Sequence, residues 1–444
     1  IPAGNRSFRF LTPMVTTTNY IKNNWQEGVN NTSLLYVNNQ NPNANYGTHI
    51  TGSTTGLNGF DATLTGNPSF YQFDNITQNW NNGIANTNAI NLVAGNAYRL
   101  LIRGNRSYDL SNTLTTNTAT ILRATGTLLT GNITFGSSSS TPSTLPILAS
   151  NANEFSFIGN PYASPIDWNT LSKSELTNYY YYWDPTLGVR GAYVSCKNDG
   201  TKSNSSSNIT TSIQPGQAFF VQNSSNIAAR QLAITEANKI TGNTNVFRPT
   251  SGTSTMSLQL FLTSNITSNG TSQDGSNVLF NSSYNNAVDD DDATKFVNQD
   301  ENIAVQRDNK LLSIENRNLV ASSTDTVHLK VWQLTQNNYT IRVDCNNFQN
   351  GSFAYLQDTY LNTESLLNLS GITDINFTTN TNSASTSANR FKIVFKSNAS
   401  LPIIFTQLKA YQKNTAVELD WDVQNDISLN SYEIEKSSDG ILFI

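Results

Sequence analysis

Val327-His328-Leu329-Lys330-Val331 is the stretch that decides the fold class, because apolar and polar side chains alternate along it without interruption. A period of two places one set of side chains on a core and the other in water, as in a strand of an antiparallel sheet. The same alternation recurs elsewhere in the chain, at Met256-Leu258-Leu260-Leu262, Tyr339-Ile341-Val343, Phe391-Ile393-Phe395 and Val417-Leu419-Trp421-Val423. We therefore expect an all-β protein built from tandem antiparallel β-sandwich domains.

The composition agrees with this expectation and narrows the classes of function. Only 13% of the 444 residues are charged, against about 25% in an ordinary soluble domain. The net charge of −5 is mild and the Lys and Arg residues are scattered, so we expect no nucleic-acid partner. No apolar run approaches the roughly 20 residues of a membrane helix, so we expect no membrane insertion.

An internal repeat organises the first half of the chain. In each copy a strand ends at a proline, an aromatic strand ends at an aspartate turn, and a third strand follows a turn glycine. The paired stretches are Phe8–Pro13 with Phe155–Pro161, Tyr71–Asp74 with Tyr181–Asp184, and Ile90–Tyr98 with Ser212–Phe219. Three matches in the same order favour a duplication. The two copies could pair into one sandwich or form two domains.

Changes in composition divide the chain into four units. We expect a β-sandwich half or domain at 1–136, a β-rich repeat of it at 150–244, and a jelly-roll-like sandwich at 253–397. Residues 137–144 are interpreted as a flexible connector, and a second boundary is expected around Pro249 and Gly252. Residues 401–444 resemble the start of a fibronectin type III-like domain, with Trp421 and Tyr432 at its core positions.

Several stretches together resemble one family of exported proteins. They are Ala97–Gly104, Phe157–Tyr162, Tyr182–Gly188, Gln214–Val221 and Trp421–Gly440. This set is similar to the region upstream of the C-terminal sorting domain in large, adhesin-like surface proteins of Flavobacterium-like Bacteroidetes, which the type IX secretion system exports. The resemblance covers nearly the whole chain. It implies an extracellular location at the cell surface, contact with the secretion machinery, and partners among other surface proteins or glycans.

The sequence offers little material for catalysis. It holds only two histidines, His49 and His328, and His328 should point away from the core face of its strand. Asp167 and Asp184 are candidates for the carboxylate pair of a glycosidase, but nothing in the sequence ties them together in space, and capping of turns is the favoured explanation for both. We therefore expect that the chain is not an enzyme.

The aromatic run from Tyr179 to Trp183 is the first candidate binding feature. On a strand, Tyr179, Tyr181 and Trp183 share one face, and Tyr180 and Tyr182 share the other. One face should belong to a core. The face of Tyr180 and Tyr182 could be an aromatic platform for a sugar ring or a partner chain, and packing of both faces in a sandwich is the alternative.

Asp289-Asp290-Asp291-Asp292 is the only dense run of charge. Four carboxylates repel one another unless they are solvated or bind a cation, and Ca²⁺ takes several oxygen ligands. A weak Ca²⁺ site and a solvated acidic loop are both compatible with this run. No other cofactor is expected.

Thr326 and the two cysteines carry smaller signals. Asp325-Thr326-Val327 resembles the short acceptor motif for O-linked glycosylation in Bacteroidetes, which makes Thr326 a candidate for modification. Cys196 and Cys345 lie on separate expected strands, so two unrelated buried thiols are favoured over a disulfide.

Two hypotheses about function follow. The leading one is a non-enzymatic structural or adhesive segment of a large extracellular protein. The alternative is a carbohydrate-binding accessory region of a secreted multi-domain hydrolase, whose catalytic domain would lie outside this sequence.

Overall fold

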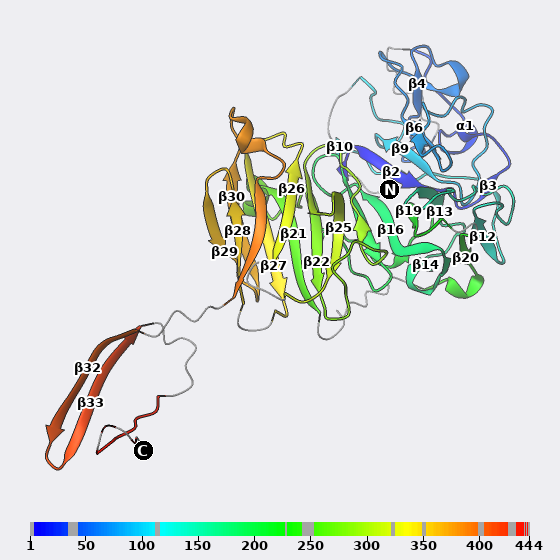
Figure 1. Ribbon diagram of the computed structural model, residues 1–444. Helices are drawn as coiled ribbons and strands as arrows, with labels where there is room; N and C mark the ends of the chain where they lie inside the picture. The colour runs from blue at the N-terminus through cyan, green and yellow to red at the C-terminus, as the bar shows by residue number, and fades with distance from the viewer. Residues whose placement is uncertain are drawn as a thin grey trace.

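The computed structural model confirms the all-β fold class (Figure 1). It describes residues 4–33, 43–111, 116–226, 229–241, 253–320, 325–348, 352–397, 404–424 and 432–438, together with Gly440 and Leu442. Within these residues the α-helices are two short segments, α1 (Ile21–Asn24) and α2 (Thr263–Thr267). The 3-10 turns are η1 (Leu57–Gly59), η2 (Trp168–Thr170), η3 (Glu236–Asn238) and η4 (Ser383–Thr386). The boundary expected around Pro249 and Gly252 lies outside the described residues.

Two small sheets with the same strand order form the first half, as a duplication would produce. In each sheet the first strand of the repeat pairs with the third strand, which pairs in turn with the aromatic strand. The sheet of the first copy contains β2 (Ser7–Leu11), β9 (Tyr98–Ile102) and β6 (Phe70–Tyr71). The sheet of the second copy contains β13 (Phe155–Gly159), β19 (Ala218–Asn223), β16 (Leu176–Asp184) and β17 (Ala192–Lys197).

The register of the strands is also the same in both copies. Leu11 pairs with Tyr98 in the first copy, and its counterpart Ile158 pairs with Phe219 in the second. The aromatic strands repeat this agreement, with Phe70 opposite Leu100 and Tyr180 opposite Val221. Because a slip of one residue would move every side chain to the other face, the shared register means that the two copies bury equivalent side chains.

An aromatic triad stands at the centre of each copy. In the first, the ring centroid of Trp25 lies 5.7 Å from Phe70 and 6.0 Å from Tyr98. In the second, Trp168 lies 5.6 Å from Tyr180 and 6.0 Å from Phe219. Edge-on and tilted contacts at these distances stabilise a core beyond the burial of area alone.

The two copies meet through reciprocal backbone contacts. Thr12 N donates to Gly216 O at 3.0 Å, and the equivalent Gly159 N donates to Gly95 O at 2.8 Å. Such an exchange, in which each copy gives the other the same contact, is the signature of a two-fold relation. The copies therefore pair with each other, which answers the question that the sequence left open.

Short two-stranded ladders complete this half of the molecule. They are formed by β1 (Gly4–Asn5), β3 (Thr16–Thr17), β4 (Thr51–Ser53), β5 (Asp61–Ala62), β7 (Phe73–Asp74), β8 (Asn79–Trp80), β10 (Thr116–Asn117), β11 (Gly126–Thr127), β14 (Ile166–Asp167) and β18 (Ser212–Ile213). A further sheet joins β12 (Ile133–Gly136), β20 (Gln231–Ile234) and β15 (Ser172–Ser174).

The boundary expected at residue 136 needs correction. Strand β12 pairs with β20, and its apolar side chains belong to the core of the second copy. Residues 137–144, expected to be a flexible connector, fold back on this unit, since Thr134 and Thr141 exchange backbone hydrogen bonds of 2.9 and 2.7 Å. The reason is that Ile133 and Phe135 are apolar on one face and need a core to cover them.

The third unit is a single hydrogen-bonded sheet that curls into a sandwich (Figure 1). Its strands are β21 (Ser254–Leu262), β22 (Asp274–Phe280), β23 (Ala293–Thr294), β24 (Asn302–Arg307), β25 (Lys310–Arg317), β26 (Thr326–Trp332), β27 (Asn338–Asn346), β28 (Ser352–Asp358), β29 (Thr363–Leu366), β30 (Ile372–Thr378) and β31 (Phe391–Ser397). The alternating apolar residues of the expected strands fill its core. One pairing departs from the antiparallel expectation, because β22 and β25 run parallel.

A shared aromatic core joins the three units that the sequence divides. Phe10 of the first copy lies 4.7 Å from Phe157 of the second, ring centroid to ring centroid. Phe296, from the third unit, lies 5.3 Å from Phe220. The sheet of the second copy is thus covered on both faces, by its own core and by this shared one.

A hairpin of β32 (Ile404–Lys413) and β33 (Ala416–Gln424) lies apart from the rest of the molecule (Figure 1). The Trp421 ring contacts Tyr432 at 5.8 Å, and several of its apolar side chains are exposed, Leu408 and Val417 among them. The fibronectin type III-like interpretation of this region stays a prediction.

Candidate functional site

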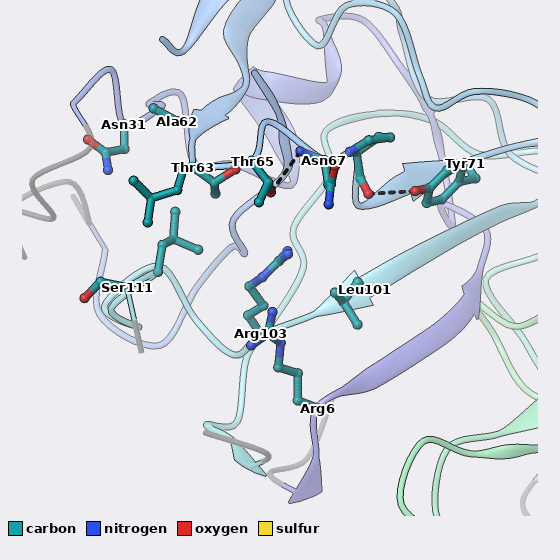
Figure 2. Close-up of a pocket in the computed structure, with 13 residues that line it drawn as sticks. Arg6, Asn31, Ala62, Thr63, Thr65, Asn67, Tyr71, Leu101, Arg103 and Ser111 are labelled. Atoms are coloured by element: carbon teal, nitrogen blue, oxygen red, sulfur yellow. Dashed lines mark hydrogen bonds between the residues drawn. The ribbon is translucent and has the colours of Figure 1, made fainter. Parts of the chain in front are cut away.

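A cavity of about 660 Å³ lies in the first copy, beside the ends of β2 and β9. Figure 2 shows it between these strands and the loop that carries residues 63–68. Its lining residues are Arg6, Asn31, Ala62, Thr63, Leu64, Thr65, Asn67, Pro68, Tyr71, Leu101, Arg103, Leu110 and Ser111. We call this cavity the arginine pocket.

Strand pairing places the two arginines side by side. Arg6 immediately precedes β2, Arg103 immediately follows β9, and the last ladder pair between these antiparallel strands is Ser7 with Ile102. The next residues outward on both strands are therefore the two arginines. Figure 2 shows their side chains next to each other, across the cavity from Thr65 and Asn67.

The guanidinium group of Arg103 is buried without a partner. Its residue is 8% exposed, and its Nη1 atom is buried with no hydrogen bond among the described residues. In the described part of the chain, no carboxylate forms an ion pair with either Arg103 or Arg6. A buried cation that lacks a counter-ion destabilises the folded state.

The pKa of Arg103 reflects this environment. Burial and, after it, the neighbouring charge of Arg6 lower the pKa to about 10, although Asp61 and two tyrosines act in the opposite direction. Both main causes disfavour the charged form of the arginine. An anion bound in the pocket would remove the repulsion and supply the missing hydrogen-bond acceptors.

Asp61 is the nearest buried acid, and other partners already hold it. Arg106 donates to both of its carboxylate oxygens at 2.9 and 2.8 Å, and His49 Nδ1 lies 3.3 Å from Oδ2. Backbone N–H groups of Asn31 and Ile50 add hydrogen bonds of 2.6 and 3.0 Å. All three side chains of this cluster are fully buried.

The same cluster fixes the wall of the pocket. Burial alone would raise the pKa of Asp61, but the charges of His49 and Arg106 outweigh burial and hold it well below its usual range. Asp61 is therefore a carboxylate committed to Arg106, and it anchors β5, whose other residue, Ala62, lines the pocket. His49, one of the two histidines in the sequence, serves this structural cluster.

The rest of the lining is neutral. Thr63, Thr65, Asn67 and Ser111 offer hydroxyl and amide groups at the rim, and apolar side chains form the remainder. Tyr71 turns its phenol ring to the cavity, while its hydroxyl donates to Pro68 O at 2.7 Å. The described residues that line the cavity include no carboxylate, imidazole or thiol. This arrangement is suited to binding an anion.

The aromatic platform predicted from Tyr180 and Tyr182 is wrong for Tyr180. Its side chain is 0% exposed and packs against Trp168 and Phe219. Tyr182 is half-buried and packs against the cores on both sides of the sheet. Both faces of this strand are covered because the third unit packs on the face that a lone sandwich would leave open.

Asp167 and Asp184 serve turns, as the alternative interpretation expected. Asp167 Oδ1 accepts from Asn169 N at 3.1 Å and caps η2. Asp184 Oδ1 accepts from Thr186 N at 2.9 Å, and its Oδ2 accepts from Ser207 Oγ at 2.5 Å. Both carboxylates therefore stabilise local structure.

The four aspartates from 289 to 292 do not converge on one point. Asp289 Oδ1 accepts from Asp291 N at 2.9 Å, and Asp292 turns inward to accept from Asn316 N at 2.7 Å. Burial raises the pKa of Asp292 to about 6. In the part of the chain that the structure describes, no group of three or more acidic, His or Cys side chains is placed to hold a metal ion. The calcium site stays a prediction.

Thr326 and the cysteines lie in ordinary strand positions. Thr326 begins β26, is half-buried and pairs with Val394, so its glycosylation stays a prediction. Cys196 and Cys345 are free and belong to different cores, which confirms the interpretation of two unrelated thiols. Burial raises the pKa of each to about 12.

One comparison with known protein families identifies the chain. A family model described as "Domain of unknown function (DUF8693)" matches residues 19–395. The chain belongs to this family. The matched range covers the first copy of the repeat except its first strand β2, the whole second copy and nearly all of the third unit. Among curated proteins and solved structures, none matches the chain. In the described residues, no helix has the length and apolarity needed to cross a membrane.

Proposed function

We propose that this chain is a non-enzymatic, extracellular adhesive segment that binds an acidic saccharide in its arginine pocket. The observation that carries this proposal is the guanidinium of Arg103, which is buried, charged and without a partner among the described residues. Such a group destabilises the ligand-free protein. The simplest reason to keep it is a ligand that supplies the opposite charge.

The charge and shape of guanidinium groups favour an anion with planar or tetrahedral oxygens. Arginine forms paired hydrogen bonds with carboxylate, sulfate and phosphate oxygens more readily than any other side chain. Two arginines side by side, Arg6 and Arg103, concentrate positive charge at one end of the pocket. A uronate or a sulfated sugar carries a matching group on a ring.

The remainder of the pocket suits the sugar ring itself. The Tyr71 ring and the Leu101 side chain offer apolar surface, and the polar groups of Thr65, Asn67 and Ser111 lie at the rim. Binding sites for small molecules commonly combine such surface with a few placed polar groups. This proposal joins the adhesive and carbohydrate-binding hypotheses in one site. The cell-surface location and export by the type IX system remain part of the proposal and rest on the sequence resemblance.

A glycan array tests the proposal directly. The labelled chain is applied to an array that contains uronic-acid oligomers, sulfated oligosaccharides and their neutral counterparts. We expect signals confined to acidic glycans, and their loss by roughly tenfold to a hundredfold in Arg103→Met, as for a lost hydrogen bond to a charged group. Arg123→Gln removes an exposed arginine that pairs with Glu27, and neither residue lines the pocket, so this variant should bind as the unmodified chain does.

Equal binding to acidic and neutral glycans would contradict the proposal, as would no binding at all. So would acidic-glycan binding that Arg103→Met leaves intact, because the anion would then be held elsewhere.

A further inference from the structure

An apolar groove of about 300 Å³ lies where the two copies of the repeat meet. Its lining residues are Leu11, Thr12, Pro13, Met14, Val15, Trp25, Ile121, Leu122, Ala124, Pro215 and Gly216. At its rim, Met14 is 44% and Ile121 52% exposed. The groove contains no charged side chain, and it is separate from the arginine pocket.

The two-fold relation between the copies identifies the counterpart of this groove. Gly216, which precedes the third strand of the second copy, corresponds to Gly95 of the first copy, and both have positive φ, of 77° and 86°. Trp25 corresponds to Trp168, since both stand in the aromatic triads. The counterpart of the groove therefore lies beside Gly95 and Trp168.

In the counterpart, a leucine of the chain itself fills the space. A Cβ atom placed on Gly95 would lie 2.5 Å from Leu145 Cδ2, so leucine packs directly against this glycine. The Leu145 side chain is 4% exposed and belongs to the same core as Trp168. At Gly216 the same construction meets, among the residues that the structure describes, only Thr12 O, at 3.6 Å. The position that leucine occupies in one copy is thus open in the other.

The segment that carries Leu145 shows what kind of chain fits such a slot. Leu145 is followed by Pro146, whose carbonyl oxygen accepts from Ser140 Oγ at 2.7 Å. Leu145 N donates to Pro142 O at 3.1 Å, so a tight turn presents the leucine. The ring of Pro146 restricts the backbone that follows, which lowers the conformational freedom lost on binding.

We infer that the open groove binds a short peptide segment of a partner protein, which inserts a leucine side chain followed by proline. The occupant would repeat in trans the contact that Leu145 and Pro146 make within the chain. Met14 and Ile121 would be covered on binding, which accounts for two large apolar side chains exposed at one rim. This inference does not depend on the arginine pocket.

A peptide with the chain's own sequence from Ser143 to Ala149, Ser-Thr-Leu-Pro-Ile-Leu-Ala, is the probe. Its fluorescent form is titrated into the whole chain, and anisotropy reports binding. We expect saturable binding, weakened roughly tenfold or more when serine replaces the leucine of the peptide, because its burial drives the contact. Ile121→Glu and Met14→Asp in the protein should weaken binding to a similar extent.

Ile76→Glu is the matched control, because Ile76 is 47% exposed and lies outside the groove. It should leave binding unchanged, and the melting temperature of each variant shows that it is folded. Two results would overturn the inference. One is a lack of saturable binding to the unmodified chain, and the other is binding that neither groove variant reduces.

Discussion

Replacing Arg103 by methionine should stabilise the protein while it abolishes ligand binding. Methionine is similar in length to the arginine stem and keeps the packing of its methylene groups, but it carries no charge. The guanidinium has no partner among the described residues and repels Arg6. If Arg103 had a structural role, its replacement would instead lower the free energy of unfolding, because most substitutions of buried residues are destabilising.

The magnitude follows from the pKa of Arg103, which is about 10 against 12.5 for an ordinary arginine. One pKa unit corresponds to about 1.4 kcal/mol, so the charge costs the folded state roughly 3 kcal/mol wherever both states are protonated. Because the pKa is lowered, this cost is fully present at pH 7 and disappears only above the pKa of the unfolded chain. Imperfect packing of methionine reduces the gain, and we expect about 1–3 kcal/mol.

Urea unfolding at pH 7 measures this difference, as a higher midpoint with an unchanged slope. The chain supplies a matched control three residues along. Arg106 is also fully buried, but it holds Asp61 through two hydrogen bonds. Arg106→Met should therefore lower the free energy of unfolding, by about 3–5 kcal/mol. If Arg103→Met were destabilised to the same extent as Arg106→Met, the reasoning about an unpartnered charge would be refuted.

Three further predictions concern other parts of the fold. Trp25→Ala and Trp168→Ala should each cost about 3–5 kcal/mol in urea unfolding, because both rings fill equivalent triads; a neutral result for either would contradict the equivalence. Because the pKa of Asp61 is held low in the folded state, the stability that its ionised form contributes is present above about pH 4 and is lost as the pH falls further. In Asp61→Asn the free energy of unfolding should therefore fall less steeply with decreasing pH than in the unmodified chain. The same pH dependence in both proteins would count against the cluster. If the aspartates of residues 289–292 bind calcium, a chelator should lower the melting temperature of the third unit, because calcium bound only to the folded state stabilises it; an unchanged melting curve would count against the calcium site.

The strands and the repeat could be predicted from the sequence because both depend on local patterns of residues. Alternation at Val327–Val331 and its counterparts placed the core residues of the third unit correctly, with Val327 and Leu329 1% exposed. The three repeated motifs were enough to indicate a duplication, whose register the structure then fixed. Separate domains were a poorer prediction, since periodicity within a strand does not reveal which units pack on one another.

That limit explains the error at Tyr180 and the failure to predict the arginine pocket. Trp168 and Phe219 of its own copy cover Tyr180, and Phe296 of the third unit covers Tyr181 on the opposite face, so contacts between segments distant in sequence closed both faces of the strand. Arg6 and Arg103 are also far apart in sequence, and only the pairing of β2 with β9 brings them together. A usable signal was present, because Arg6 directly precedes the first strand of the first copy and Arg103 directly follows its third strand.

Calorimetric titration of the chain with a galacturonic-acid oligomer and with its methyl ester is the most direct test of the central claim. The two ligands share their rings and hydroxyls and differ in the charge of the carboxyl groups. We predict measurable binding of the acid, which weakens as salt screens the pocket, and little binding of the ester. Equal affinity for the two ligands would contradict a site built around Arg6 and Arg103.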